Sequence, residues 1–180
     1  MTLAEVLIAL AILALLAAVL YPTIMAQLTR GQSAALANQL GIFRDAVHQY
    51  RENVGRFPNT LVQLTTQPTA GALDICGAAV PAGLLSRWRG PYLNQAVVPD
   101  SVKVGDATVL TQLFRNPANT AAGQTGMLWI VGYNVDSAAA VDLEAHFDGN
   151  ADFAVGNFLW VPTFIGLPNF FFLQVPIRGC

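Results

Sequence analysis

Charged residues are scarce in this chain of 180 residues. Asp, Glu, Lys and Arg make up 11% of it, where a soluble domain has about 25%, and the formal net charge is −2. So little positive charge gives no field that attracts a polyanion, so nucleic acid is not an expected partner. The sequence also lacks a nucleophile elbow, a phosphate-binding loop, a dinucleotide fingerprint and zinc-ligand spacing, and we therefore expect no enzyme activity.

Hydrophobic residues are abundant instead, at 54% of the chain, and a long run of them lies at the amino end. Residues 1–22 contain one charged side chain, Glu5, and the first basic residue is Arg30. A helix of about 21 residues rises about 31 Å, enough to cross a hydrocarbon core of about 30 Å. A secretory signal peptide is disfavoured because an acid lies inside the run, no Lys or Arg precedes it, and the helical pattern continues beyond it.

Glu5 has two interpretations. A carboxylate in an apolar helix costs up to a few kcal/mol in lipid unless it is paired or lies near the interface. Glu5 either lies at headgroup level beside the positive helix N-terminus, which stabilises an anion, or pairs with a cation of another chain. The α-amino group of an identical subunit is the obvious candidate for that cation. Position alone leaves both interpretations open.

The amino end resembles the mature N-terminus of type IV pilins and the related pseudopilins. The resemblance covers roughly the first 25 positions without a gap and rests on these residues: Thr2, Leu3, Glu5, the Ala/Leu/Ile run to Leu20, and Pro22. In that family, prepilin peptidase removes a short basic leader and the new first residue is N-methylated. The resemblance therefore implies that Met1 is the processed, N-methylated residue and that Met1 and Glu5 act in subunit assembly.

The resemblance also implies a life cycle. The subunit is a single-pass protein of the inner membrane before assembly. The pilus assembly machinery then builds it into a homo-oligomeric helical filament at the cell surface. The leading hypothesis is thus an extracellular structural subunit that needs no cofactor. The alternatives are the major pseudopilin of a type II secretion system and a minor pilin or other membrane-anchored binding module.

Helical periodicity continues after the apolar run and predicts an amphipathic helix over residues 23–54, with Gly55 as its stop. Its apolar stripe is spaced 4, 3, 4 and 3 residues apart: Leu36, Leu40, Phe43, Val47 and Tyr50. Its polar face holds Gln32, Ser33, Arg44, Gln49 and Arg51. Pro22 has no amide hydrogen and crowds the preceding turn, so we expect a kink or local break near residues 18–22.

Residues 55–180 are expected to form the head domain. A short helical turn is predicted near Leu61–Leu64, and strand-like runs separated by Gly, Pro, Asn and Asp follow. These runs are Val97–Val98, Val102–Val104, Thr108–Phe114, Met127–Val135, Ala140–Phe147 and Asn157–Val161. The expected fold class is α+β and type IV pilin-like, with a long kinked N-terminal helix packed on an antiparallel β-sheet head domain. We expect the aromatic tail from Phe158 to fill the core and to form subunit contacts.

Two short strings extend the family resemblance. GRFPNTLVQL (55–64) resembles a segment that follows the long helix in many pilin-like proteins, and WRGPYL (88–93) resembles a segment of the major pseudopilin of type II secretion. A turn at Gly90–Pro91, with Trp88 and Tyr92 as core anchors, also explains the second string without any binding role.

The chain has two cysteines, Cys76 and Cys180. A translocated domain meets an oxidising compartment, where such a pair is expected to form a disulfide; two free thiols are the alternative. The bond would close a loop of about a hundred residues, worth about 4–5 kcal/mol in the chain-entropy model.

Asp148, Asn150 and Asp152 have the alternate spacing of the first three ligands of a calcium loop. The EF-hand pattern then fails, because Phe153 stands where it has Gly and Leu159 where it has Glu. Pseudopilins often bind calcium in their C-terminal loops, so Ca²⁺ is a candidate ligand. The same residues make good turns without a metal. Glu144 or Asp142 would complete a site only if the loop folded back.

Overall fold

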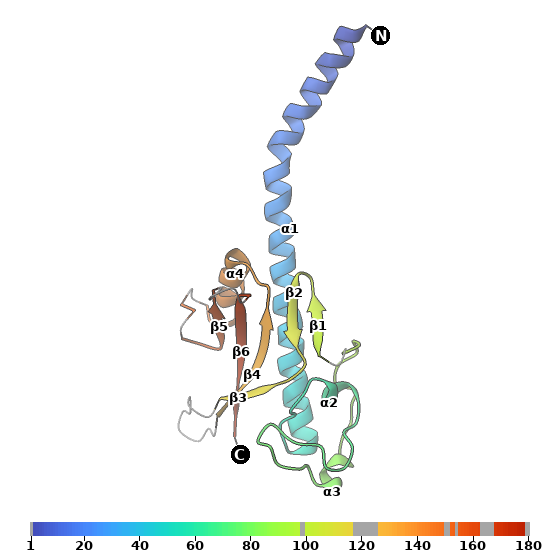
Figure 1. The fold of residues 1–180 in the computed structure, drawn as a ribbon, viewed down its shortest axis with the longest axis vertical. Helices are drawn as coiled ribbons and strands as arrows, with labels where there is room; N and C mark the ends of the chain where they lie inside the picture. Colours follow the sequence, from blue (N-terminus) through green and yellow to red (C-terminus); the bar gives the residue numbers. More distant parts are fainter. Residues whose placement is uncertain are drawn as a thin grey trace.

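The computed structural model describes residues 2–97, 100–116, 126–149, 152–153, 155–162 and 168–178. One long helix, α1 (Leu3–Val54), carries a head domain around its C-terminal half, while its N-terminal half projects away from the head (Figure 1). The described part of the head contains an antiparallel sheet and three shorter helices, so the fold is α+β as expected.

Both ends of α1 are capped by their own sequence. Thr2 is the N-cap residue of a capping box, in which its Oγ1 accepts from the amide of Glu5 at 3.4 Å. The Glu5 carboxylate in turn accepts from the amide of Thr2 at 2.7 Å. At the other end Gly55 adopts the left-handed conformation, with a φ of 78°, and its N–H bonds to the carbonyl of Arg51. The predicted stop at Gly55 is confirmed.

Pro22 lies inside α1 and does not break it. The helix continues from Leu3 to Val54, and the hydroxyl of Thr23 bonds to the carbonyl of Leu20 at 2.7 Å in the turn that contains the proline. Figure 1 shows that the N-terminal half of α1 curves away from the axis of the rest. α1 is therefore curved but unbroken: of the kink or local break expected near residues 18–22, the break is not found and a kink at Pro22 stays a prediction.

The apolar stripe of α1 is the centre of the core. All five of its predicted members are buried: Leu36, Leu40, Phe43, Val47 and Tyr50. The assignment of Ser33 to the solvent face is wrong, because this side chain is buried and donates a hydrogen bond to the carboxylate of Asp142 at 2.8 Å. Asp142 belongs to a helix that packs against that face of α1.

That helix, α4 (Ser137–Phe147), corrects the strand expected at Ala140–Phe147. Asp136 caps its N-terminus by accepting from the amide of Ala139 at 2.7 Å. The Ala, Leu and Glu residues that follow the cap are good helix formers, and the buried face of α4 packs on the sheet. Two short helices, α2 (Val62–Thr65), which was expected, and α3 (Ala82–Leu85), lie in the connection after α1.

The sheet has the strand order β1-β2-β4-β6-β5, with β3 also paired to β4, and all its pairs are antiparallel. Its strands are β1 (Ser101–Val104), β2 (Ala107–Leu110), β3 (Phe114–Asn116), β4 (Gly126–Tyr133), β5 (Phe158–Val161) and β6 (Phe170–Ile177). The run expected at Thr108–Phe114 is divided between β2 and β3, because the backbone of Thr111 and Leu113 bonds to the connection after α1. Of the run expected at 97–98, Val97 is not in a strand and Val98 lies outside the described residues.

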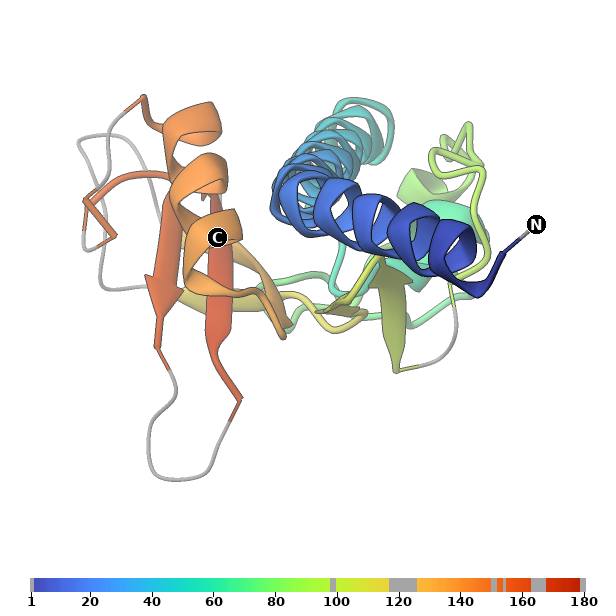
Figure 2. The same ribbon diagram turned by 90° about the horizontal axis from the view of Figure 1, so that it is seen from above.

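The longest pairing, between β4 and β6, runs from Gly126 opposite Ile177 to Tyr133 opposite Phe170. The tail after residue 168 thus supplies a central strand, which the sequence did not predict. Seen from above, α1 and α4 lie on the same face of the sheet, while no described helix covers the other face (Figure 2). We call these the inner and the outer face.

Candidate functional site

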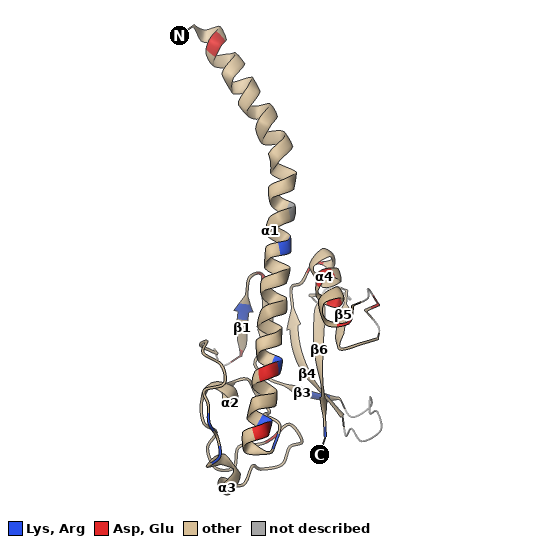
Figure 3. Cartoon of the chain, turned by 180° about the vertical axis from the view of Figure 1, so that it is seen from behind, with Lys and Arg blue, Asp and Glu red and all other residues tan. Residues whose placement is uncertain are grey.

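The first candidate site is the apolar segment, residues 3–28 of α1. Every side chain described in it is exposed, including Leu15 at 69% and Val19 at 71%. Figure 3 shows its one acidic residue near the amino end and the first basic residue only where the helix reaches the head. Among the described residues, α1 is the one helix long and apolar enough to cross a membrane. Since soluble monomers rarely expose so large an apolar surface, this segment is the first candidate surface for contact with lipid or with other protein.

Glu5 is placed by its own helix end. The capping box uses one carboxylate oxygen, Oε2, which accepts from Thr2. The structure thus brings Glu5 to the positive end of α1, which agrees with the local interpretation. Met1 lies outside the described residues, so its roles in processing and in pairing with Glu5 stay predictions.

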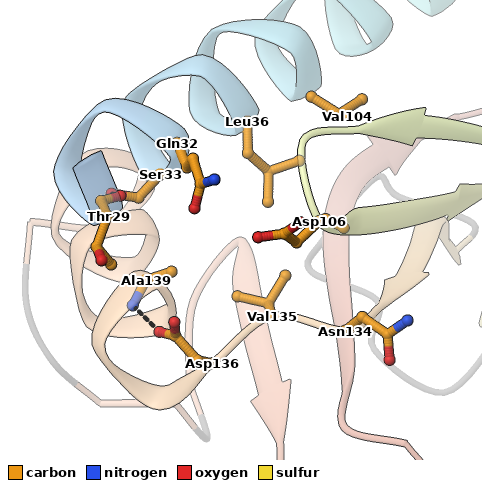
Figure 4. A pocket seen from close by; sticks show the side chains of 11 residues that line it. Thr29, Gln32, Ser33, Leu36, Val104, Asp106, Asn134, Val135, Asp136 and Ala139 are labelled. Atoms are coloured by element: carbon orange, nitrogen blue, oxygen red, sulfur yellow. Dashed lines mark hydrogen bonds between the residues drawn. The ribbon is translucent and has the colours of Figure 1, made fainter. Parts of the chain in front are cut away.

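A small polar pocket lies where α1 enters the head (Figure 4). It is lined by residues of α1, of the β1–β2 turn and of the β4–α4 turn, among them Gln32, Ser33, Asp106, Asn134 and Asp136. Its volume of about 40 Å³ has room for a few water molecules and none for an organic ligand. The pocket is therefore part of the junction between helix and head.

Cys76 is disulfide-bonded, so a free thiol is excluded at this position. Its loop is held by Asp74, a buried acid whose carboxylate accepts from the amides of Cys76 at 3.0 Å and Ala78 at 2.9 Å and contacts Arg56 at 3.4 Å. Cys180 lies outside the described residues, so the pairing Cys76–Cys180 stays a prediction.

The segment predicted as a calcium loop does fold back on itself. Both carboxylate oxygens of Asp148 accept hydrogen bonds from the backbone amide of Asn157, at 2.8 and 2.9 Å, and one of them also accepts a hydrogen bond from the backbone amide of Phe158 at 2.8 Å. The side-chain amide of Asn157 adds a fourth hydrogen bond at 2.9 Å. Asp148 thus braces the connection between α4 and β5.

Within the described residues, no complete set of calcium ligands is found at this loop. Hydrogen bonds occupy both oxygens of Asp148, Asp152 is exposed, and Asp142 points instead to Ser33 on α1. Within the described ranges no three His, Cys, Asp or Glu side chains gather closely enough to hold a metal. Asn150 lies outside those ranges, so the calcium hypothesis stays a prediction.

The burial of Glu144 was not predicted from the sequence. This side chain is fully buried on the inner side of α4, and neither of its carboxylate oxygens has a hydrogen-bond partner among the described residues. Burial, with a smaller contribution from the charges of Asp148 and Asp152, raises its pKa to about 7. Its helical spacing from Ala140 and Leu143, which share the buried face, was the signal available in the sequence.

The WRGPYL string forms a packed turn. Trp88 and Tyr92 meet edge to face with ring centres 5.6 Å apart, and Tyr92 also packs on Tyr50 of α1 at 5.9 Å. The Tyr92 hydroxyl accepts from the amide of Arg89 at 2.9 Å, and the Trp88 indole donates to the carbonyl of Gln63 at 3.1 Å. These contacts confirm that Trp88 and Tyr92 are core anchors.

Comparisons with models of protein families, with curated proteins and with solved structures find no match for this chain. The surfaces described above are therefore the basis for a functional assignment, together with the resemblance at the amino end.

Proposed function

We propose that this chain is a pilin, the structural subunit of a helical type IV pilus-like filament assembled through the apolar segment. One observation carries the proposal. The apolar segment is exposed along its length, yet it is continuous with the part of α1 that is the core of the head. A membrane anchor for a soluble domain needs only a flexible link, whereas an unbroken helix fixes the head relative to whatever surrounds the segment.

The mechanism follows from the environment that such a segment requires. Before assembly the segment spans the inner membrane, and the assembly machinery then extracts the subunit after prepilin peptidase has processed it. The segment moves from lipid into a bundle of identical helices, a transfer between two similarly apolar surroundings, so helix packing and pairing set the register. One contact repeated along a screw axis then gives an open extracellular polymer.

Pairing between Glu5 and the α-amino group of a neighbouring subunit is the proposed register device. Two variants of the full-length protein distinguish the two roles of Glu5, capping its own helix and pairing with a neighbouring subunit. Glu5→Gln keeps a side chain that completes a capping box but removes the charge, whereas Glu5→Ala removes both. If pairing sets the register, both variants insert into membranes like the wild type and both lose most of their filament yield. Normal filaments from Glu5→Gln would show that only the cap matters and would contradict the pairing.

The major pseudopilin of a type II secretion system is the second candidate function. The WRGPYL string (88–93) favours it, because this string resembles a segment of the major pseudopilin. The two functions are separated by shearing cells and sequencing the subunit of any surface fibre that is released. A pilin is expected in such a fibre, whereas a pseudopilin forms a short periplasmic piston and is not released with it. A full-length protein that sediments only as a monomer would instead support a membrane-anchored binding module.

A further inference from the structure

The outer face of the sheet is apolar along its centre. β4 and β6 pair in a register that places Val131 opposite Phe172 and Tyr133 opposite Phe170 on this face. The alternate residues of the same strands, such as Ile130 opposite Leu173, are buried on the inner face. Strands that are apolar on both faces are typical of sheets that are covered on both faces. Here the described helices cover only one of them (Figure 2).

The outer face holds a groove with a volume of about 570 Å³. We call it the outer-face groove, and it is lined by Leu110, Phe114, Arg115, Asn116, Trp129, Val131, Phe170 and Phe172. Phe114 is 43% exposed, and Trp129 packs on Phe172 with ring centres 5.0 Å apart. The indole N–H of Trp129 is buried and has no acceptor within the described part of the chain. Buried donors normally have a partner, and Trp and Arg are typical of the centres of interfaces.

A complementary surface lies on the connection between α4 and β5. Val155, at 67%, is the most exposed of the large apolar side chains described in the head. Its amide bonds to the carbonyl of Asp152 at 3.3 Å, and the four hydrogen bonds of Asp148 brace the same connection. Val155 therefore presents an apolar side chain to solvent, and hydrogen bonds hold the described residues on either side of it, including the acids Asp148 and Asp152.

We propose that, in the filament, Val155 of one copy packs into the outer-face groove of the next copy, with Asp152 facing Arg115. The proposal rests on the proposed function, because it needs many copies held in a repeating arrangement. The charges are complementary: acids lie on α4 and on the described residues that follow it, and a basic residue lies on β3 at the groove (Figure 3).

The contact also has the right symmetry for a filament. The loop and the groove are different parts of the chain, so each bound copy still offers an unused loop at one side and an unused groove at the other. Such a heterologous contact propagates into an open polymer and does not close into a dimer.

The first test compares two exposed valines in the full-length protein. Val155→Asp is expected to raise the concentration needed for polymerisation about tenfold, because burying a valine contributes roughly 1.5 kcal/mol or more. Val141→Asp is the matched control: this valine is 43% exposed on α4, outside the groove and the loop, and the variant is expected to polymerise like the wild type. The melting temperature of each variant in detergent checks that the fold is unchanged.

The second test places a photo-crosslinking amino acid at position 155. In filaments we expect a crosslink to a β4 or β6 peptide of another copy. Normal polymerisation of Val155→Asp, or crosslinks to any other surface, would overturn this contact and leave the filament proposal intact. A wild-type protein that never polymerises would overturn both.

Discussion

Substitution of the buried acid, Glu144→Gln, is expected to stabilise the protein in a pH-dependent way. Glu144 has a folded-state pKa of about 7, against an ordinary value of 4.5. Below about pH 4.5 the carboxyl is protonated in both the folded and the unfolded chain, so its charge has no effect on stability. As the pH rises from 4.5 to 7, the unfolded chain ionises first and the folded state loses stability, and above pH 7 the loss is complete.

The size of that loss follows from the shift in pKa. The shift from 4.5 to about 7 corresponds to at most about 3.5 kcal/mol, because one pKa unit is about 1.4 kcal/mol. Glutamine keeps the shape and cannot ionise, although its amide still lacks partners. We therefore expect Glu144→Gln to melt several degrees above the wild type at pH 8 and close to it at pH 4.

The assay is thermal unfolding of full-length protein in detergent, followed by circular dichroism at pH 4, 6 and 8 with a chelator present. Glu52→Gln on the exposed side of α1 is the matched control and should shift little at any pH. The reasoning would be refuted if Glu144→Gln changed the melting temperature equally at pH 4 and pH 8, or lowered it at pH 8.

Two further predictions concern the head domain. Gly132→Ala should lower the free energy of unfolding by about 1–3 kcal/mol, because its new Cβ would meet the ring of Phe171 and lie 2.7 Å from a backbone carbonyl of β2. Gly31→Ala is the control: a Cβ at this position of α1 meets no other atom, so this variant should keep or raise the melting temperature. Cys76→Ser, Cys180→Ser and the double variant should all lose the same stability, up to about 4–5 kcal/mol, if the two cysteines pair. Unequal single variants, or one thiol that reacts with a probe before reduction, would contradict the pairing.

The long helix could be predicted because its determinants are local. The apolar run, the stripe from Leu36 to Tyr50 and the glycine at position 55 each act within a few residues, and α1 has these features where the sequence places them. Of the two outcomes expected at Pro22, a break is excluded, because α1 continues as one helix from Leu3 to Val54.

α4 was missed because two periods overlap in its sequence. Val141, Leu143, Ala145 and Phe147 alternate with polar or small residues as in a strand, and this alternation concealed the helical face. The better signal was Asp136, which caps the helix. The error extended to Ser33, whose burial depends on α4.

The remaining features depend on long-range pairing, which spacing along the chain does not encode. Asp148 was singled out for its distance from Asp152, but the partner that occupies its oxygens is Asn157. The outer-face groove exists only because β6 pairs with β4, and the prolines of the tail concealed that strand. Pro176 is tolerated because β5 pairs with β6 only from Phe170 to Leu173, so Pro176 has an unpaired strand edge on that side.

We propose that the apolar segment exchanges lipid for copies of itself. Cryo-electron microscopy of the polymer formed by the wild-type full-length protein is the decisive experiment. We expect residues 3–28 to lie along the filament axis, with each helix surrounded by the same residues of other copies. A polymer in which these residues face solvent or lipid while the heads make all the contacts would contradict it.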